Sequence, residues 1–173
     1  MSSTTVLGVI PGKRPLYLLE LHNSHGWAPS IWDRLVKHLY GFEGYLFHGE
    51  GEKYLDRLWR EIEEQPEWAQ AANVLTFDTG VIPGQAYLWA ADMLDEFERR
   101  CPSPETHVNH VPTVAAFFRT LPEVPFVGVY GTSVSENPFD PWDSEKDEPG
   151  QGIALSDMYL LERHRQFATE DQR

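Results

Sequence analysis

Two pairs of histidines, each pair three residues apart, are the clearest candidates for chemistry in this chain of 173 residues. The first pair is His22 and His25, and the second is His107 and His110. Neutral imidazole is a good zinc ligand, so four ring nitrogens from two loops could form a tetrahedral site. The spacing is weakly specific, because the sequence has no H-E-x-x-H motif and no pair of cysteines.

Two interpretations of these histidines therefore stay open. The simpler one is that they form local hydrogen bonds in loops. The alternative is a small zinc-dependent hydrolase that uses both H-x-x-H pairs, with Asp78 as its base. The sequence does not show whether the two pairs meet in space, so no metal ligand is assigned.

A nucleophile with its base is the second chemistry that the residue types allow. Ser24 or Ser133 could combine with a histidine and Asp78, but neither serine lies in a G-x-S-x-G motif. Cys101 follows Phe97 by four residues and continues the apolar stripe of a predicted helix, which favours a buried structural thiol over a nucleophile. We therefore expect no catalytic residue and no cofactor.

The chain is strongly acidic, with 27 acidic and 14 basic residues and a net charge of −13. Such a chain is repelled by nucleic acid phosphates and by anionic lipid, so we expect it to bind neither nucleic acid nor a membrane. The expected partner is a basic protein. No apolar run is long enough to span a bilayer, and the N-terminal segment does not resemble a signal peptide. Together with the single cysteine, these observations predict a cytoplasmic protein.

The acidic residues concentrate in one Pro- and Gly-rich segment, residues 136–152, ENPFDPWDSEKDEPGQG. Its six carboxylates and one basic residue, Lys146, give it a net charge of −5. A long loop of this kind is typically functional or disordered. The predicted partner-binding residues are Glu136, Phe139, Asp140, Trp142, Asp143 and Glu145.

Phe139 and Trp142 within this segment allow two interpretations. Both rings could fold back onto the core and anchor the loop. Alternatively, they could be the aromatic anchors of an interface, stiffened by neighbouring prolines and steered by carboxylates towards a basic cleft. The preferred function follows from the second interpretation: an acidic inhibitor that binds a basic partner, most concretely an immunity protein that neutralises a bacterial toxin enzyme.

The hydrophobic patterns predict the elements that must position these residues. Residues 1–173 are expected to form a single α+β domain, in which a small mixed or antiparallel sheet packs with four or five helices. A capping box of Ser30 and Asp33 is expected to start the first helix, and Gly41 to end it. Residues 168–173 are expected to fray. The predicted strands are residues 5–10, 15–21, 73–78 and 125–134, and the turn signal PGKR is expected to join the first two as a β-hairpin. The predicted helices are residues 30–39, 53–65, 85–100, 113–121 and 156–167.

Overall fold

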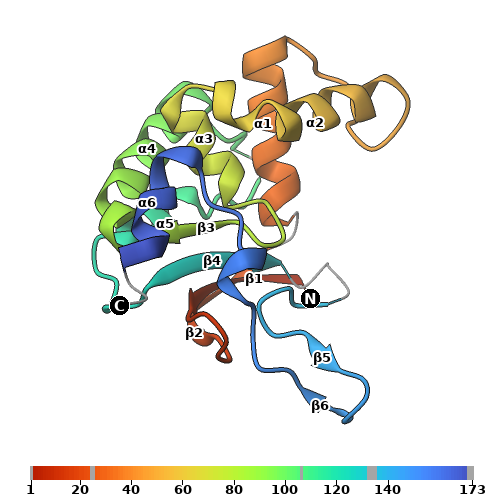
Figure 1. Ribbon diagram of the computed structural model, residues 1–173. Helices are drawn as coiled ribbons and strands as arrows, with labels where there is room; N and C mark the ends of the chain where they lie inside the picture. The colour runs from red at the N-terminus through yellow and green to blue at the C-terminus, as the bar shows by residue number, and fades with distance from the viewer. Residues whose placement is uncertain (1, 24–25, 106, 132–135, 171–173) are drawn as a thin grey trace.

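The computed structural model describes residues 2–23, 26–105, 107–131 and 136–170. These residues form a four-stranded antiparallel sheet, six α-helices and a separate two-stranded ribbon, so the predicted α+β class is confirmed (Figure 1). The strand order in the sheet is β2-β1-β4-β3. Within the described ranges, no helix has the length and apolar character needed to cross a membrane.

The centre of the sheet is the pairing of β1 (Ser2–Val9) with β4 (Phe126–Gly131). The predicted hairpin is confirmed, since β1 also pairs with β2 (Leu16–Asn23) on its other side. The short strand β3 (Val81–Pro83) pairs with the outer side of β4. Successive side chains of a strand point to opposite faces of the sheet, and here both faces are apolar.

The first face is covered by the helical layer, which lies above the sheet in Figure 1. Side chains of the strands and of several helices form one large core there, including Val127, Leu35, Leu94 and Phe97. The helices are α1 (Trp27–Tyr40), α2 (Glu50–Arg60), α3 (Glu67–Val74), α4 (Tyr87–Arg100), α5 (Val111–Phe118) and the short α6 (Arg165–Glu170).

The strand predicted for residues 73–78 is wrong, because this apolar stretch continues α3 and then turns. The buried amide of Asn73 donates to the carbonyl of Leu58 at 3.0 Å, which fixes the end of the helix inside the core. The Thr76 hydroxyl then donates to the Asn73 carbonyl at 2.6 Å and closes the turn. A short buried helix end and a buried strand have the same apolar pattern. The strand lies instead at residues 81–83, within TGVIPG, a stretch whose glycines and proline are typical of a loop.

The first helix begins earlier than predicted and without the capping box. It starts at Trp27, after Gly26, whose φ of 77° is a backbone conformation that favours glycine, and no side chain of the described residues caps it. Ser30 and Asp33 therefore lie inside the first turns of α1. The predicted end is confirmed, because Gly41 adopts the left-handed conformation and donates its N–H to the Lys37 carbonyl.

The second face of the sheet is covered by residues 137–160, which follow β4 in the chain. Phe139 is fully buried there and packs with Leu7 and Phe126 of the sheet. Its ring lies directly against Gly128 of β4, where an added Cβ atom would be 2.4 Å from the Phe139 Cζ atom. Glycine is therefore required at this position because the ring occupies the place of a side chain.

The C-terminal part of the chain then passes the outer edge of β3. The N–H of Val81 donates to the Tyr159 carbonyl at 3.0 Å, and the Tyr159 N–H donates to the Thr79 carbonyl at 2.9 Å. Beyond this edge the chain joins the helical layer, where buried His164 contacts the Trp89 ring. We name residues 158–170 the C-terminal strap.

The strap replaces the continuous helix predicted for residues 156–167. The strap begins with an extended segment, residues 158–161, which lies between the 3-10 turns Leu155–Asp157 and Glu162–His164. The chain is extended there because it must cross the sheet edge before it reaches α6. Residues 168–170, which were expected to fray, belong to α6, and residues 171–173 lie outside the described part.

Gly128→Ala is expected to lower the free energy of unfolding by about 1–3 kcal/mol, because the new methyl group overlaps the Phe139 ring. Glycine to alanine within a strand otherwise tends to stabilise, so the sign is diagnostic. Urea unfolding of a double-mutant cycle with Phe139→Leu checks it. Gly128→Ala should lower the free energy of unfolding by less in the Phe139→Leu variant than in the native protein, because leucine is smaller. Strictly additive effects of the two substitutions would contradict the contact.

His164 is expected to destabilise the fold in acid. Burial lowers the pKa of this imidazole to about 4, and the charge of Arg163 acts in the same direction. Because the pKa in the unfolded chain is about 6.5, the fold favours the neutral ring. This contribution is present above about pH 6.5 and is lost as the pH falls towards 4, at a cost on the order of 2–3 kcal/mol.

Unfolding of the His164→Phe variant at neutral and at acidic pH measures this contribution. The variant should lose less stability than the native protein between the two conditions. His48→Gln, at an exposed position, is the matched control and should leave the pH dependence unchanged. Equal pH dependence of the native protein and the His164→Phe variant would exclude the buried imidazole as a cause.

Candidate functional site

The segment predicted to be a long irregular loop contains a small β-ribbon that projects below the sheet (Figure 1). Strand β5 (Trp142–Asp143) pairs with β6 (Glu148–Pro149) in antiparallel fashion. The base of the ribbon is closed by the N–H of Gly150, which donates to the Pro141 carbonyl at 2.8 Å. We name residues 141–150 the acidic ribbon, whose four carboxylates and one lysine give a net charge of −3.

Two of the six predicted contact residues anchor the ribbon to the body of the protein. Phe139 lies in the second core, so its ring is not offered to a partner. The Asp140 side chain is only 7% exposed and accepts hydrogen bonds from Nε and Nη2 of Arg14, which lies 126 positions earlier in the β1–β2 turn. The same ion pair raises the pKa of Arg14 above its usual value. Both residues therefore fix where the ribbon begins.

A third predicted contact residue, Asp143, shapes the turn of the ribbon. Its Oδ1 atom accepts the N–H groups of Glu145 and Lys146 at 3.1 and 3.2 Å. Its Oδ2 atom lies 3.0 Å from the Lys146 ammonium group, and these contacts lower the pKa of the Asp143 carboxyl group. Asp143 thus keeps its charge and holds the turn that displays the neighbouring carboxylates.

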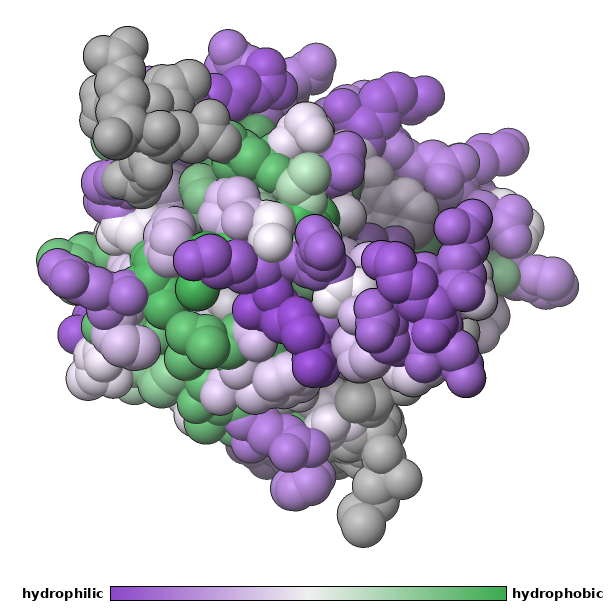
Figure 2. Space-filling view, turned by 60° about the horizontal axis from the view of Figure 1, so that its bottom comes forward, coloured by the Kyte–Doolittle hydropathy of each residue, from purple (hydrophilic) through white to green (hydrophobic). Residues whose placement is uncertain are grey.

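The other three predicted contact residues are exposed. Trp142 is 53% exposed, which is unusual for so large an apolar ring. Glu145 lies in the exposed turn, and the Oε1 atom of Glu136 accepts the backbone N–H of Trp142 at 3.4 Å. Hydrophilic side chains cover much of this underside, beside an apolar strip (Figure 2). The result is a narrow, firmly held element that presents one indole ring among carboxylates.

The histidines do not form a metal site among the described residues. One histidine of each pair lies near the other pair, because the Nε2–H of His110 donates to the backbone carbonyl of His22 at 2.8 Å, so this ring nitrogen is occupied. His25 lies outside the described part of the chain. Within that part, no three His, Cys, Asp or Glu side chains lie close enough to hold a metal ion. The described residues therefore provide no set of ligands for the zinc site of the alternative hypothesis.

The proposed nucleophiles also gain no partner from the described residues. Ser24 and Ser133 both fall outside the described ranges, and Asp78 is an exposed residue of the turn after α3. Cys101 is buried at the end of α4, as predicted. Burial raises the pKa of its thiol to about 11, although Arg34 and Arg100 oppose the shift, so the sulfur stays protonated at neutral pH.

Comparison of the chain with protein families, with curated proteins and with solved structures finds no match. The surface and the cavities of the molecule are therefore the observations that bear on its function.

The contrast between the two aromatic residues of the segment is open to measurement. Phe139→Ala should lower the free energy of unfolding by about 3–5 kcal/mol, because it empties a site at the centre of the second core. Trp142→Ala should change it by no more than about 0.5 kcal/mol, because that ring is exposed. Urea unfolding of both variants gives the two values, and similar losses would contradict the assignment of one ring as anchor and the other as contact.

Proposed function

We propose that the protein is an inhibitor that binds a basic partner enzyme through the acidic ribbon. Its concrete form is a cytoplasmic immunity protein of a bacterial toxin pair. The observation that carries the proposal is the exposed Trp142 ring, presented among carboxylates on a projecting ribbon.

The ribbon has the physical properties of a recognition element. An exposed indole gains free energy when a partner removes it from water, and tryptophan is among the residues that dominate interface energies. The anchors at Phe139, Asp140 and Gly150 order the ribbon before binding, so little conformational entropy is lost on docking.

Charge supports the same partner. The ribbon carries −3 and the whole chain −13, so a basic protein surface is attracted at long range while anionic ligands are repelled from the underside. Enzymes that act on nucleic acids or nucleotides bind phosphate in positively charged clefts. A narrow acidic element with an aromatic anchor fits such a cleft and would block it.

The partner to test is the product of the neighbouring open reading frame, which we expect to be a secreted protein with a toxin-like C-terminal enzyme domain. Trp142→Ala combined with Glu145→Lys should weaken binding to that domain by at least about 100-fold and reduce the salt dependence of association. Surface plasmon resonance at low and high salt measures both effects, and the activity of the enzyme domain reports inhibition.

The matched control is Leu88→Ala combined with Glu52→Lys, which makes the same kinds of change at exposed positions of α4 and α2. This control should bind as the native protein does. Native affinity in the ribbon variant, with its stability unchanged, would show that the ribbon is not the contact surface.

A further inference from the structure

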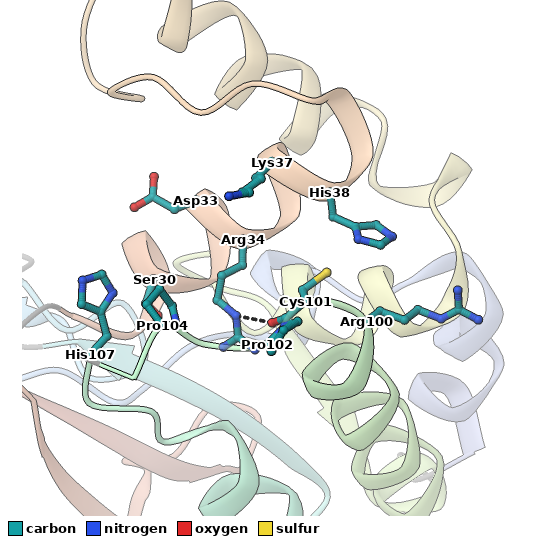
Figure 3. Close-up of a pocket in the computed structure, with 10 residues that line it drawn as sticks. All are labelled: Ser30, Asp33, Arg34, Lys37, His38, Arg100, Cys101, Pro102, Pro104 and His107. Carbon is teal, nitrogen blue, oxygen red and sulfur yellow. Dashed lines mark hydrogen bonds between the residues drawn. The ribbon is translucent and has the colours of Figure 1, made fainter.

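A groove of about 510 Å³ lies on the helical side of the molecule, between α1 and the segment that follows α4 (Figure 3). We name it the α1 groove. Three of its lining side chains are permanent cations, namely Arg34, Lys37 and Arg100, and only one, Asp33, is a carboxylate. Three cations thus gather in one hollow of a chain whose net charge is −13, and each of them pairs with a carboxylate outside the lining, namely Glu98, Glu43 and Glu96.

Arg34 lies at the wall of the groove with its guanidinium group held rigidly. Its side chain spans from α1 to the end of α4, where Nε donates to the Cys101 carbonyl at 2.6 Å and Nη2 to the Glu98 carboxylate at 2.6 Å. The guanidinium carbon lies 4.3 Å from the centre of the Phe97 ring. The residue is only 7% exposed, so these contacts fix the direction of its remaining donors.

The third nitrogen of Arg34, Nη1, is buried and has no hydrogen-bond partner among the described residues. Buried donors in folded proteins are almost always paired, because an unpaired N–H loses its contact with water and gains nothing in return. Arg34 lines the α1 groove, so an acceptor bound in the groove is a candidate partner for this donor.

The other two cations of the groove, Lys37 and Arg100, each form an ion pair, and the Arg100 guanidinium carbon also lies 5.6 Å from the centre of the Trp68 ring. The Nζ atom of Lys37 lies 2.8 Å from Oε1 of Glu43, and the Arg100 guanidinium pairs with Glu96. Neither of these carboxylates lines the groove. The Lys37–Glu43 pair is exposed on both sides, and ion pairs of this kind are weak. The groove also raises the pKa of Asp33, because the carboxylate loses water there, although His107 opposes the shift.

We propose that the α1 groove binds a small molecule that carries a phosphoryl group. A tetrahedral phosphoryl group accepts hydrogen bonds from several directions at once, which suits the unpaired Nη1 donor of Arg34 together with the cations of Lys37 and Arg100. The volume lies within the range of small-molecule sites. Helices α1 and α4, which contribute residues to the groove, belong to the helical layer, and the acidic ribbon lies on the other side of the sheet (Figure 1), so this site is independent of the proposed inhibitor function.

The test is a titration of the full chain with sodium phosphate, followed in two-dimensional proton–nitrogen NMR spectra. Saturable shifts are expected for the Arg34 Nε–H signal and for the backbone amides of Ser30 and Cys101. Sodium acetate at equal ionic strength is the comparison and should give much weaker shifts. Shifts that do not saturate, or equal effects of acetate, would overturn the assignment of a phosphoryl site.

Variants locate the binding. Lys37→Gln combined with Arg100→Gln removes two exposed cations and should weaken phosphate binding by at least about tenfold. Arg60→Gln removes an exposed cation of α2 outside the groove and should leave binding unchanged. Arg34→Lys keeps the charge but loses the Nη1 donor, and should also weaken binding. If Arg34→Lys fails to fold, the double variant still decides, because native affinity in it would place the phosphate elsewhere.

Discussion

The second apolar face of the sheet must be kept from water, and the rest of the architecture follows from this constraint. The helical layer covers only one face, so residues 137–160 have to return beneath β1 and β4. Phe139 begins this cover, and Gly128 makes room for its ring. The acidic ribbon leaves the body directly after this contact, and the C-terminal strap begins within the last residues of the covering segment. The exposed Trp142 is therefore positioned by a buried neighbour three residues away.

Much of the fold was accessible from the sequence, because its longest elements have clear patterns. The helix at residues 85–100 and the hairpin at residues 5–21 are confirmed as α4 and as β1 with β2. Short buried elements were not accessible. The end of α3 reads as a strand, and β3 has only three residues and includes a proline. In such cases the tertiary contacts, for example that of Asn73 with Leu58, decide between patterns that look alike.

The candidate sites show the same limit for a different reason. The sequence indicated an acidic aromatic segment, but it could not separate Phe139, an anchor, from Trp142, an exposed ring. The role of Asp140 depends on Arg14, which is 126 positions away in the chain. The α1 groove was missed altogether, because Arg34 and the Cys101 carbonyl are 67 positions apart and each looks ordinary in its own segment. Net charge predicts none of these local arrangements, since cations gather in one hollow of an acidic protein.

The position of the covering segment in the chain has a consequence for biosynthesis. All four strands of the main sheet precede residue 132, whereas their cover on the second face follows residue 136. A nascent chain that has just completed β4 thus presents Leu7, Val9 and Phe126 to the ribosome surface and to chaperones. The second face is covered only after the residues that follow β4 have been translated, so a ribosome that stalls between the codons of β4 and those of the strap leaves a half-covered, aggregation-prone intermediate.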